Sequence, residues 1–420
     1  MYHIIIIKKM KYSTVKKCRC CGKKKLKNFF NFGSMCLSTQ FPPKNTKKIS
    51  KIPMNVKICE NCKLVQLQHN YDLKKLYNKD YGYKSGVNQT MNQHLEAITN
   101  EIENIVKFEK KDVVLDIASN DGTLLKKYKN KKITRFGIDP TIRKFRSNYP
   151  KNYLKYSGFF NKKIYKKIAK TKAKAITSIA VFYDIPNPNK FVNDISKILD
   201  FNGVWVLEQS YFPKLFLNNA YDSMCHEHLT YFTYYQINLI LKKHNLRVFD
   251  IKLNEMNGGS IRFFIAHINS IYKKKNKSIY SILKIEKKYF FNLEKNLIKF
   301  KKNINNSKKQ LKQFIKKKIK QKKKIHLYGA STKGNIILQF CDIQQNQIEF
   351  AADRNYEKWG RETPGSKIPI ISEKKSRLKN PDYYLVMPWH FKKEILQREK
   401  NFIKKGGKLI FPLPKLHIVS

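Results

Sequence analysis

Four cysteines near the start of the chain have the spacing of zinc ligands. Cys18 and Cys21 form one Cys-x-x-Cys pair, and Cys59 and Cys62 form a second. Two such pairs supply four thiolates to a tetrahedral Zn2+, and a closed site of this kind has no open position for catalysis. The sequence therefore predicts a structural zinc site, with residues 22–58 as an inserted loop. The alternative is a pair of metal-free turns with core cysteines.

A turn rich in acids and amides follows the apolar run at residues 113–117. Asp116 lies inside this run, and Asp139 ends the next apolar run roughly 20 residues later, a spacing that suits a carboxylate holding ribose hydroxyls. The turn has neither the glycine pattern of a dinucleotide site nor a P-loop. Acids at strand ends suit a cationic adenosine cofactor better than a pyrophosphate, so we expect S-adenosylmethionine (SAM); the alternative is an ordinary strand and turn. The expected cofactor residues are Asp116, Ser119, Asn120, Asp121, Gly122 and Asp139, with Asp184 and Glu208 at the ends of two later strands.

The segment His226-Glu227-His228 carries the candidate proton acceptor. Position 230 is Thr230, so the segment is not the His-Glu-x-x-His motif of zinc peptidases, and the sequence offers no third metal ligand nearby. A histidine beside a glutamate is a natural general base, because the carboxylate can orient the imidazole or tune its pKa. The alternative is a structural histidine cluster.

Three further polar segments could contact an acceptor molecule. Residues 77–86 hold tyrosines next to glycines and can cover a ligand, although such a loop can equally be ordinary packing. Residues 257–262 offer glycine amides, a hydroxyl and a guanidinium, which suit a sugar or a phosphate; the alternative is a turn at the start of a strand. Residues 325–335 are typical of a strand, a turn and a helix start, whose exposed amides form an anion site. The expected substrate residues are Tyr83, Asn257, Gly258, Gly259, Ser260, Arg262, Ser331, Thr332 and Lys333.

The elements that must position these residues alternate between strands and helices. Apolar residues at helical spacing predict a helix over residues 88–106, and residues 112–267 alternate strands with helices as in a parallel sheet. A Lys-rich amphipathic helical stretch follows, and its second part, 301–324, is mostly polar and expected to link domains. The predicted fold class is α/β, with a zinc-binding domain at 1–72, a Rossmann-like SAM-binding domain at 73–270, a Lys-rich helical linker at 271–324 and a second Rossmann-like, substrate-binding domain at 325–420.

The composition is strongly basic. The chain has 420 residues, enough for two or three domains, and a formal net charge of +57, which makes nucleic acid one alternative partner. The lysines are spread over the whole length together with abundant isoleucine and asparagine, as an AT-rich coding sequence produces. We therefore expect a small-molecule substrate rather than nucleic acid, with a field that favours anionic substrates.

The chain carries no recognisable membrane or export segment. Residues 1–9 hold too short an apolar run for a signal, and no run approaches the ~18–20 apolar residues of a membrane span. Six of the eight cysteines fall in the first 62 residues, which indicates metal rather than disulfides. We expect a cytoplasmic protein without a membrane partner, as a monomer or weak oligomer.

Several motifs occur together in a specific order: Cys18-x-x-Cys21 with Cys59-x-x-Cys62, Asn120-Asp121-Gly122, Glu227-His228, Gly258-Gly259-Ser260-x-Arg262, and the turn from Tyr328 to Lys333. This combination resembles the three-part sugar C-methyltransferases, SAM-dependent enzymes that methylate C-3 of nucleotide-linked 4-keto-sugars. The resemblance covers almost the whole chain. It implies a zinc-ribbon domain, a class I methyltransferase domain and a C-terminal substrate domain. It also implies that His228 is the base and that Tyr81 lies at the active site.

Three positions depart from the pattern of the sugar enzymes. Asp184 stands where they carry an active-site histidine on the third strand. Cys225 stands where they carry a tyrosine three residues before the base. The cofactor strand ends in Asp116-Ile-Ala-Ser119, where the pattern more often has Glu-Ile-Gly.

The expected reaction begins when His228, aided by Glu227, removes a proton from the carbon next to a ketone, and the enolate then attacks the methyl group of SAM. Such a proton is far too weakly acidic for imidazole in water, so the site must stabilise the enolate oxygen. Tyr81, Tyr83 or Asn257 could donate that hydrogen bond. The alternative function is a zinc-containing nucleic-acid methyltransferase whose lysines grip phosphates, with Cys225 as the candidate nucleophile for cytosine C5.

Overall fold

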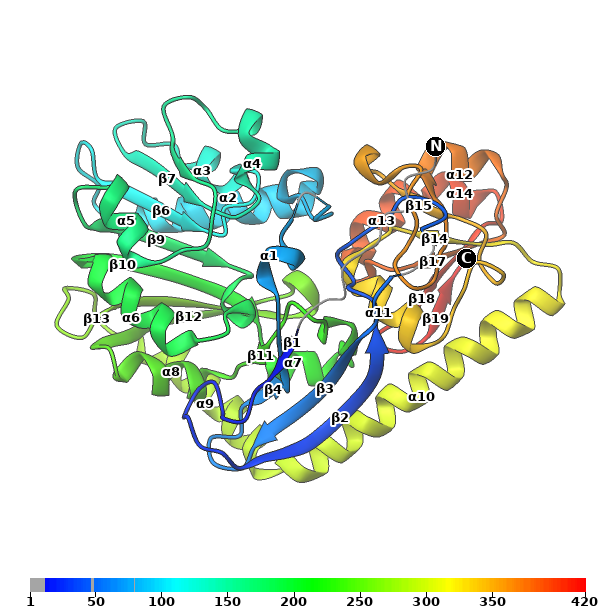
Figure 1. Ribbon diagram of the computed structural model, residues 1–420, viewed down its shortest axis with the longest axis horizontal. Helices are drawn as coiled ribbons and strands as arrows, with labels where there is room; N and C mark the ends of the chain where they lie inside the picture. The colour runs from blue at the N-terminus through cyan, green and yellow to red at the C-terminus, as the bar shows by residue number, and fades with distance from the viewer. Residues whose placement is uncertain (1–11, 47–48, 79) are drawn as a thin grey trace.

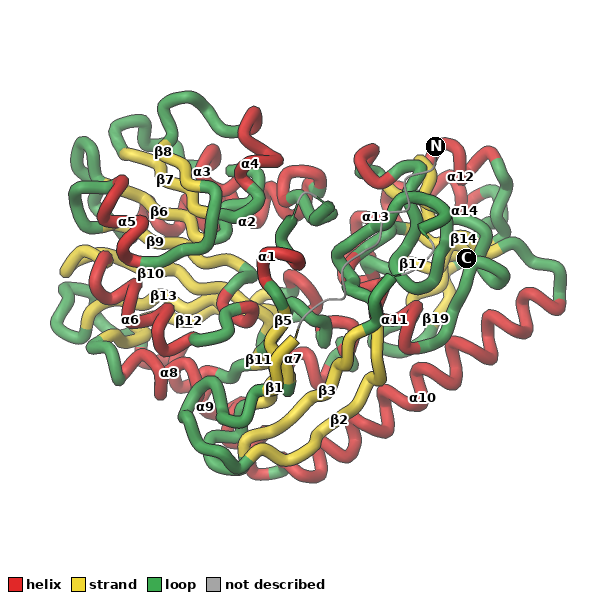
Figure 2. Tube along the Cα trace, viewed as in Figure 1, coloured by secondary structure: helices red, strands yellow, loops and turns green. Residues whose placement is uncertain are grey.

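The computed structural model of the protein describes residues 12–46, 49–78 and 80–420. Two α/β lobes stand side by side, and the N-terminal strands and a long helix run beneath them (Figure 1; Figure 2). The expectation about residues 1–9 lies outside the described residues. Among the described helices, none is long and apolar enough to cross a membrane.

The central sheet has seven strands in the order β12-β13-β10-β9-β6-β7-β8. Strand β6 (Val113–Ile117), whose five residues are all buried, lies between β7 (Thr134–Ile138) and β9 (Ala173–Ile179) and runs parallel to both. The chain thus leaves β6 toward one side and later returns to the other, so the turns after β6 and β9 open on one crevice. The other strands are β8 (Leu154–Tyr156), β10 (Leu199–Ser210), β12 (Leu246–Asn254) and β13 (Ser260–His267), the last antiparallel to both of its neighbours.

Alternate residues of a strand point to opposite faces of its sheet. Both faces of the central sheet carry buried apolar residues, and helices cover both. Helices α2 (Gln89–Ile105) and α3 (Thr123–Lys127) pack on the face of Val114. The predicted helix over 88–106 is therefore confirmed. The opposite face, with Leu115, is covered by α5 (Lys162–Ile168), α6 (Pro188–Ile198) and α8 (Tyr234–Lys242). The short helices of this region are α1 (Leu73–Leu76), α4 (Ile142–Phe145) and α7 (Phe212–Leu217).

The C-terminal sheet repeats this plan with the order β16-β15-β14-β17-β18-β19. Strand β14 (Ile325–Tyr328) lies between β15 (Ala351–Asp353) and β17 (Tyr383–Val386), parallel to both, and so creates a second switch point. The predicted α/β class with two Rossmann-like sheets is confirmed. The remaining elements are β16 (Ile370–Ser372), β18 (Lys408–Phe411), β19 (His417–Val419), α11 (Thr332–Phe340), α12 (Glu373–Leu378), α13 (Lys392–Arg398) and α14 (Lys400–Lys404).

The N-terminal sheet is completed by a strand from the central lobe. Its order is β11-β4-β3-β2, in which β2 (Leu26–Met35) and β3 (Ile52–Cys59) form a long hairpin beside β4 (Val65–Leu67). Strand β11 (Thr230–Tyr231) begins two residues after His228 and pairs with β4. The segment that carries the candidate base is therefore fixed against the N-terminal module. A separate two-stranded sheet joins β1 (Tyr12–Thr14) to β5 (His69–Tyr71).

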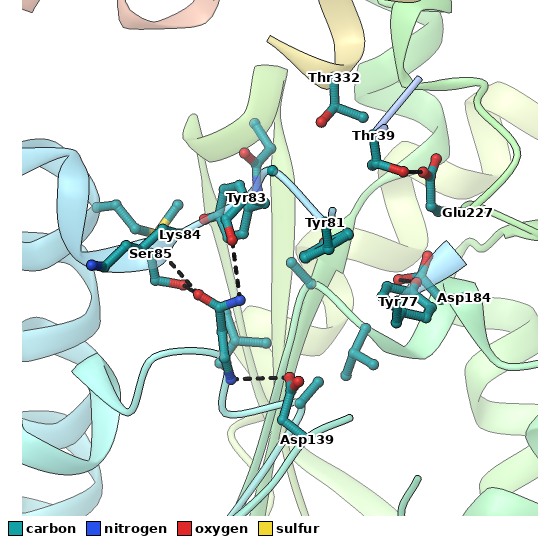
Figure 3. A pocket seen from close by; sticks show the side chains of 18 of the residues that line it. Thr39, Tyr77, Tyr81, Tyr83, Lys84, Ser85, Asp139, Asp184, Glu227 and Thr332 are labelled. Atoms are coloured by element: carbon teal, nitrogen blue, oxygen red, sulfur yellow. Dashed lines mark hydrogen bonds between the residues drawn. The ribbon is translucent and has the colours of Figure 1, made fainter. Parts of the chain in front are cut away.

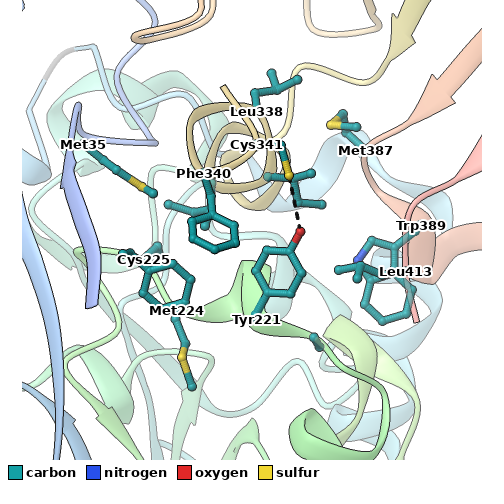
Figure 4. Close-up of a cluster of buried hydrophobic side chains, with 14 of the residues drawn as sticks. Met35, Tyr221, Met224, Cys225, Leu338, Phe340, Cys341, Met387, Trp389 and Leu413 are labelled. Carbon is teal, nitrogen blue, oxygen red and sulfur yellow. Dashed lines mark hydrogen bonds between the residues drawn. The ribbon is translucent and has the colours of Figure 1, made fainter. Parts of the chain in front are cut away.

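One hydrophobic cluster joins the hairpin to both lobes. The ring of Tyr221 from the central lobe lies 6.4 Å from Phe32 of β2 and 5.6 Å from Phe340 of α11 (Figure 4). Met35 and Cys225 lie in the same cluster. This packing makes the two lobes and the hairpin one body around the crevice.

The Lys-rich stretch is helical, as expected, and forms α9 (Asn276–Phe291) and α10 (Leu293–Lys320); its role as a link between domains stays a prediction. Phe300, Ile304, Leu311 and Ile315 are buried and belong to the same cluster as the C-terminal sheet. They are spaced by four or seven residues among lysines, so one apolar stripe suffices to pack a helix that is polar on average. The predicted limits 1–72, 73–270, 271–324 and 325–420 stay a prediction, because β11 and α10 tie neighbouring units together.

Candidate active site

The four predicted zinc ligands lie together. Their sulfur atoms are all within 4.8 Å of one another, with Cys18 and Cys62 3.5 Å apart and Cys21 and Cys59 3.6 Å apart. Zn–S bonds of about 2.3 Å in a tetrahedron place sulfurs about 3.8 Å apart, so the donor set fits zinc. The Sγ atom of Cys20 points away, toward the carbonyl of Gln236. None of the four cysteines lines the crevice between the lobes, which agrees with a structural site.

The turn after β6 is shaped by close packing around Gly122. Its φ is +74°, and a Cβ atom there would lie 2.9 Å from the ring of Tyr149. The Tyr149 hydroxyl in turn bonds to the Ser119 hydroxyl at 2.8 Å and donates to the Asn120 carbonyl at 2.9 Å. Gly122 therefore shapes the turn from behind, and it does not line the crevice.

Asp139 lies at the end of β7, directly beside this turn (Figure 3). Its Oδ2 accepts the Asn120 amide at 3.0 Å, and its Oδ1 accepts the Thr141 amide and hydroxyl, each at 2.5 Å. Burial raises the pKa of Asp139, and these hydrogen bonds offset part of the rise. A carboxylate has about four lone-pair positions, so Oδ2 keeps one for a ribose hydroxyl. The residues present fit the adenosine end of SAM.

Asp116 and Asp121 have other partners. Asp116 accepts the Thr177 hydroxyl at 2.6 Å, and burial raises the pKa of Asp116 to about 7. Asp121 accepts the Gly86 amide at 3.0 Å, while the side-chain oxygen of Asn120 accepts the Ser85 amide at 3.0 Å. Asn120 and Asp121 thus hold the aromatic loop over the turn. Asn120 still lines the crevice, whereas Asp121 does not.

Glu208 and Arg262, expected to bind different ligands, bind each other. They stand opposite in the β10–β13 register, with Arg262 Nε donating to Glu208 at 2.7 Å and the guanidinium also reaching Glu101 at 2.8 Å. His94 lies 2.5 Å from the other Glu208 oxygen. Burial alone would raise the pKa of Glu208, but His94 and Arg262 lower it. Glu208 and His94 line the crevice, and Arg262 does not.

The glycine segment after β12 contributes one residue to the crevice, Asn257. A Cβ atom on Gly258 would meet Trp389, and one on Gly259 would meet Lys214, so these glycines allow close packing. The Ser260 hydroxyl donates to the Met256 carbonyl. The structure therefore does not bring Gly258, Gly259, Ser260 or Arg262 to the expected substrate site.

His228 has a fixed tautomer. Its Nδ1 lies 2.6 Å from the carbonyl oxygen of Ser223, which can only accept, so Nδ1 carries the proton and Nε2 keeps a free lone pair. Its ring lies 4.1 Å from that of Tyr183. Burial and then the ammonium of Lys333 lower the pKa of His228 to about 3. The imidazole that lines the crevice is therefore neutral.

Glu227 does not orient this imidazole, contrary to the expectation. Its carboxylate accepts the hydroxyl of Thr39, and the Ser38 hydroxyl lies 3.4 Å away (Figure 3). The orienting group is the Ser223 carbonyl. Tyr81 lies near Glu227, and burial followed by that carboxylate raises the pKa of Tyr81 well above its ordinary value. Tyr81 is thus a permanent O–H donor on the crevice wall.

The C-terminal lobe contributes the opposite wall. Ser331, Thr332 and Lys333 line the crevice at the start of α11, where the Ser331 hydroxyl caps the Gly334 amide. Lys333 Nζ donates to the Asn257 carbonyl at 2.7 Å. Burial lowers the pKa of Lys333, and the Asp222 carboxylate opposes the decrease. The ammonium therefore lies where the two lobes meet.

The crevice between the lobes has a volume of about 660 Å3, within the range of about 300–1,000 Å3 of ligand sites. The sequence missed several residues of its wall. Thr39 comes from the N-terminal module, and no local pattern marks it. Tyr77 begins the aromatic segment 77–86 that was expected to cover a ligand, but the sequence did not single it out as a site residue. Asp353 could have been found, because it ends a predicted strand as Asp139 does. The expected residues that line the crevice are Tyr81, Tyr83, Asp116, Ser119, Asn120, Asp139, Asp184, Glu208, Glu227, His228, Asn257, Ser331, Thr332 and Lys333.

Three family models match consecutive parts of the chain. The "Putative zinc binding domain" matches residues 18–77, the "Methyltransferase domain" matches 90–251, and the "C-methyltransferase C-terminal domain" matches 255–414. C-methyltransferase NovU from Streptomyces niveus is 26% identical over 410 residues, which is 97% of each chain.

Solved structures similar to parts of the chain include LepI in complex with SAM and the cyclopropane synthase MmaA2 from Mycobacterium tuberculosis. The LepI match has 13% identity and a TM-score of 0.34, and covers 44% of this chain and 53% of that one. The MmaA2 match has 10% identity and a TM-score of 0.32, and covers 40% and 83% respectively. The domain order found by the family models is the one expected from the motifs.

Proposed function

Because the chain is a zinc-binding, SAM-dependent C-methyltransferase, we propose that its acceptor is a ketone, best met by a nucleotide-linked keto-sugar. SAM supplies an electrophilic methyl group when bound, so the acceptor carbon must become nucleophilic by losing a proton. The observation that carries the proposal is the neutral His228, which keeps an Nε2 lone pair and lines the same crevice as Asp139. A neutral imidazole in the wall of a ligand crevice suits proton abstraction next to a carbonyl.

The low basicity of His228 defines what else the site must supply. With a pKa of about 3, the imidazole holds an added proton only while a negative charge develops beside it. Lys333, the cation that lowers this pKa, would stabilise an enolate oxygen formed in the same place. The phenol of Tyr81 adds a hydrogen-bond donor that burial keeps protonated.

The C-terminal wall supports an anionic acceptor. The N-terminus of α11 presents amides beside Ser331 and Thr332, an arrangement that binds phosphate groups in many proteins. The net charge of +57 raises the local concentration of such anions. A nucleotide-linked sugar held on this wall would present its ring to His228 and Tyr81.

A matched pair of substrates tests the proposal. Purified protein is incubated with SAM carrying a 13C-labelled methyl group and with nucleotide-linked 4-keto-sugars, and products are analysed by NMR. The expected product has a new carbon-bound methyl group next to the ketone. The same sugars with the ketone reduced to a hydroxyl serve as the control and should accept no methyl group. Transfer to oxygen, or failure with every keto-sugar, would contradict the ketone acceptor.

A further inference from the structure

The carboxyl group of Asp184 has one occupied and one free oxygen. Asp184 follows β9, and its Oδ2 accepts the hydroxyl proton of Tyr77 at 2.9 Å (Figure 3). Its Oδ1 is buried and has no hydrogen-bond partner among the described residues. Both Asp184 and Tyr77 line the crevice. A buried polar atom without a partner is costly, so this oxygen is a candidate contact for a ligand.

The surroundings of Asp184 favour its neutral form. Burial raises the pKa of Asp184 well above its ordinary value; the Tyr77 hydrogen bond opposes this rise, and the neighbouring Glu227 carboxylate adds to it. The charged or titratable groups whose ionisation couples to Asp184 are Tyr77, Tyr81, Tyr183, Cys225, Glu227 and Tyr231. Each of these is neutral or negative, so none stabilises a second negative charge by Coulomb attraction.

The Tyr77 hydroxyl also determines which oxygen of Asp184 carries the proton. Tyr77 donates to Oδ2, so a protonated carboxyl with this geometry carries its hydrogen on Oδ1. Asp184 follows Tyr183 in the sequence, and the ring of Tyr183 lies 4.1 Å from the ring of His228. Asp184 and His228 both line the crevice, which therefore contains an acid and a base.

We propose that Asp184 is a catalytic acid, whose Oδ1–H donates to the ketone oxygen of the acceptor while His228 Nε2 removes the neighbouring C–H proton. The inference rests on the proposed ketone acceptor. The electrons of the broken C–H bond form the C=C bond, the carbonyl π electrons move to oxygen, and that oxygen takes the Asp184 proton. The product is a neutral enol, with Asp184 as a carboxylate that Tyr77 stabilises. After the carbon has been methylated, the hydroxyl proton returns to Asp184, and the proton on His228 leaves to solvent.

An acid and a base that act together explain how an imidazole of low basicity can remove the proton. Concerted transfer gives the ketone oxygen a proton from Asp184, so no enolate forms that Lys333 and Tyr81 would have to stabilise, and the resulting imidazolium and carboxylate carry opposite charges in one cavity. The net charge of the site does not change during the step. The hydrogen bond from Tyr77 positions the carboxyl group of Asp184. Burial keeps this carboxyl protonated and keeps the imidazole of His228 neutral.

The test measures enol formation without methyl transfer. Wild type and Asp184→Asn are incubated in D2O, without SAM, with a thymidine-diphosphate-linked 4-keto-6-deoxyhexose, and deuterium uptake next to the ketone is followed by NMR. Asparagine keeps the shape and a hydrogen-bond donor but cannot give up its proton, so exchange should fall about 100-fold or more. Asp200→Asn, at a partly exposed position outside the crevice, is the matched control and should exchange like wild type.

Infrared spectroscopy gives a readout that needs no substrate. In the difference between the spectra of wild type and Asp184→Asn at neutral pH, the C=O stretching band of one protonated carboxyl should be present; other buried acids such as Asp116 contribute equally to both spectra and cancel. This difference band together with slowed exchange in Asp184→Asn, at unchanged SAM affinity and melting temperature, supports the role. Absence of the band, or exchange by Asp184→Asn within about threefold of wild type, would overturn it. If the wild-type protein neither exchanges deuterium into the probe nor methylates it, the proposed ketone acceptor is overturned. The role of Asp184 toward a ketone then falls with it.

Discussion

Asp139 and Asp353 hold the same position in the two Rossmann-like sheets. Each ends the strand beside the first strand of its sheet, and each accepts an amide from the turn after that first strand: Asn120 at 3.0 Å for Asp139 and Ala330 at 2.8 Å for Asp353. Their remaining partners differ. Each carboxylate accepts three hydrogen bonds, but Asp353 pairs with the Lys358 ammonium at 3.2 Å, whereas the three donors to Asp139 among the described residues are neutral amide and hydroxyl groups.

This difference predicts that only Asp139 contributes to SAM affinity. Asp139→Asn should raise the Kd for SAM roughly 10- to 100-fold, because a hydrogen bond to a charged acceptor is worth about 1.5–3 kcal/mol. Asp353→Asn breaks the equivalent internal bonds and should leave the Kd unchanged. Isothermal titration calorimetry with both variants measures this, and equal losses of affinity would show that the effect is structural.

Replacement of the base should separate chemistry from binding. His228→Asn removes the Nε2 lone pair, and we expect methyl transfer to fall about 10^2- to 10^4-fold while the Kd for SAM changes only a few-fold. His267→Asn, on β13 away from the crevice, provides a control with the same substitution. Turnover near the wild-type rate in His228→Asn would contradict the assignment.

The neighbouring His226 should make stability depend on pH. It is fully buried, and burial lowers its pKa to about 4. Because the folded-state pKa lies below the unfolded value of about 6.5, the unfolded chain binds the proton first, and stability is lost as pH falls from about 6.5 toward 4. The loss between pH 7 and 5 should be about 2 kcal/mol for this one group.

A difference measurement isolates this effect from the buried acids, whose raised pKa values act in the opposite direction. His226→Phe keeps a ring against Tyr71, which lies 5.0 Å away, and cannot be protonated. The free energy of unfolding of wild type minus that of the variant should decrease by the stated amount between pH 7 and pH 5. A difference that stays constant with pH would mean that His226 is not held neutral.

How much of this site could be foreseen depends on the distance in sequence between partners. The turn after β6 and the strand-end acid Asp139 were predictable, because both follow from local patterns. The pairing of Glu208 with Arg262 was not, since it needs the antiparallel register of β10 and β13, which no local pattern specifies. The bond from Thr39 to Glu227 joins residues 188 positions apart and depends on how the hairpin docks.

The helical character of the Lys-rich stretch was predictable from its amphipathic pattern, and α9 and α10 are helices as expected. That four apolar residues would bury one side of α10 was not predictable from its polar average composition. The prediction for the aromatic loop at residues 77–86 was correct in part. The tyrosines of the loop line the crevice, but Asn120 and Asp121, which we expected to bind the cofactor, hold the loop in place.

Removal of zinc should destabilise the N-terminal module. Cys59→Ser should lower the zinc content from one ion per chain toward zero and lower the melting temperature, because binding energy of structural zinc is folding energy. Cys20→Ser is the matched control, since its sulfur points to the Gln236 carbonyl and not to the cluster. It should retain zinc in elemental analysis. Loss of zinc from both variants alike would contradict the assignment of the ligands.

A nucleic-acid methylase that attacks cytosine would need Cys225 as its nucleophile. The thiol is fully buried, burial raises its pKa well above the ordinary value, and the residue does not line the crevice (Figure 4). Attack requires an accessible thiolate, so Cys225→Ala should keep methyl transfer to the ketone within a few-fold of wild type. Cys341→Ala removes a thiol from the same cluster and controls for lost packing. If Cys225→Ala alone abolished activity while both variants bound SAM normally, the ketone mechanism would give way to a cysteine-dependent one.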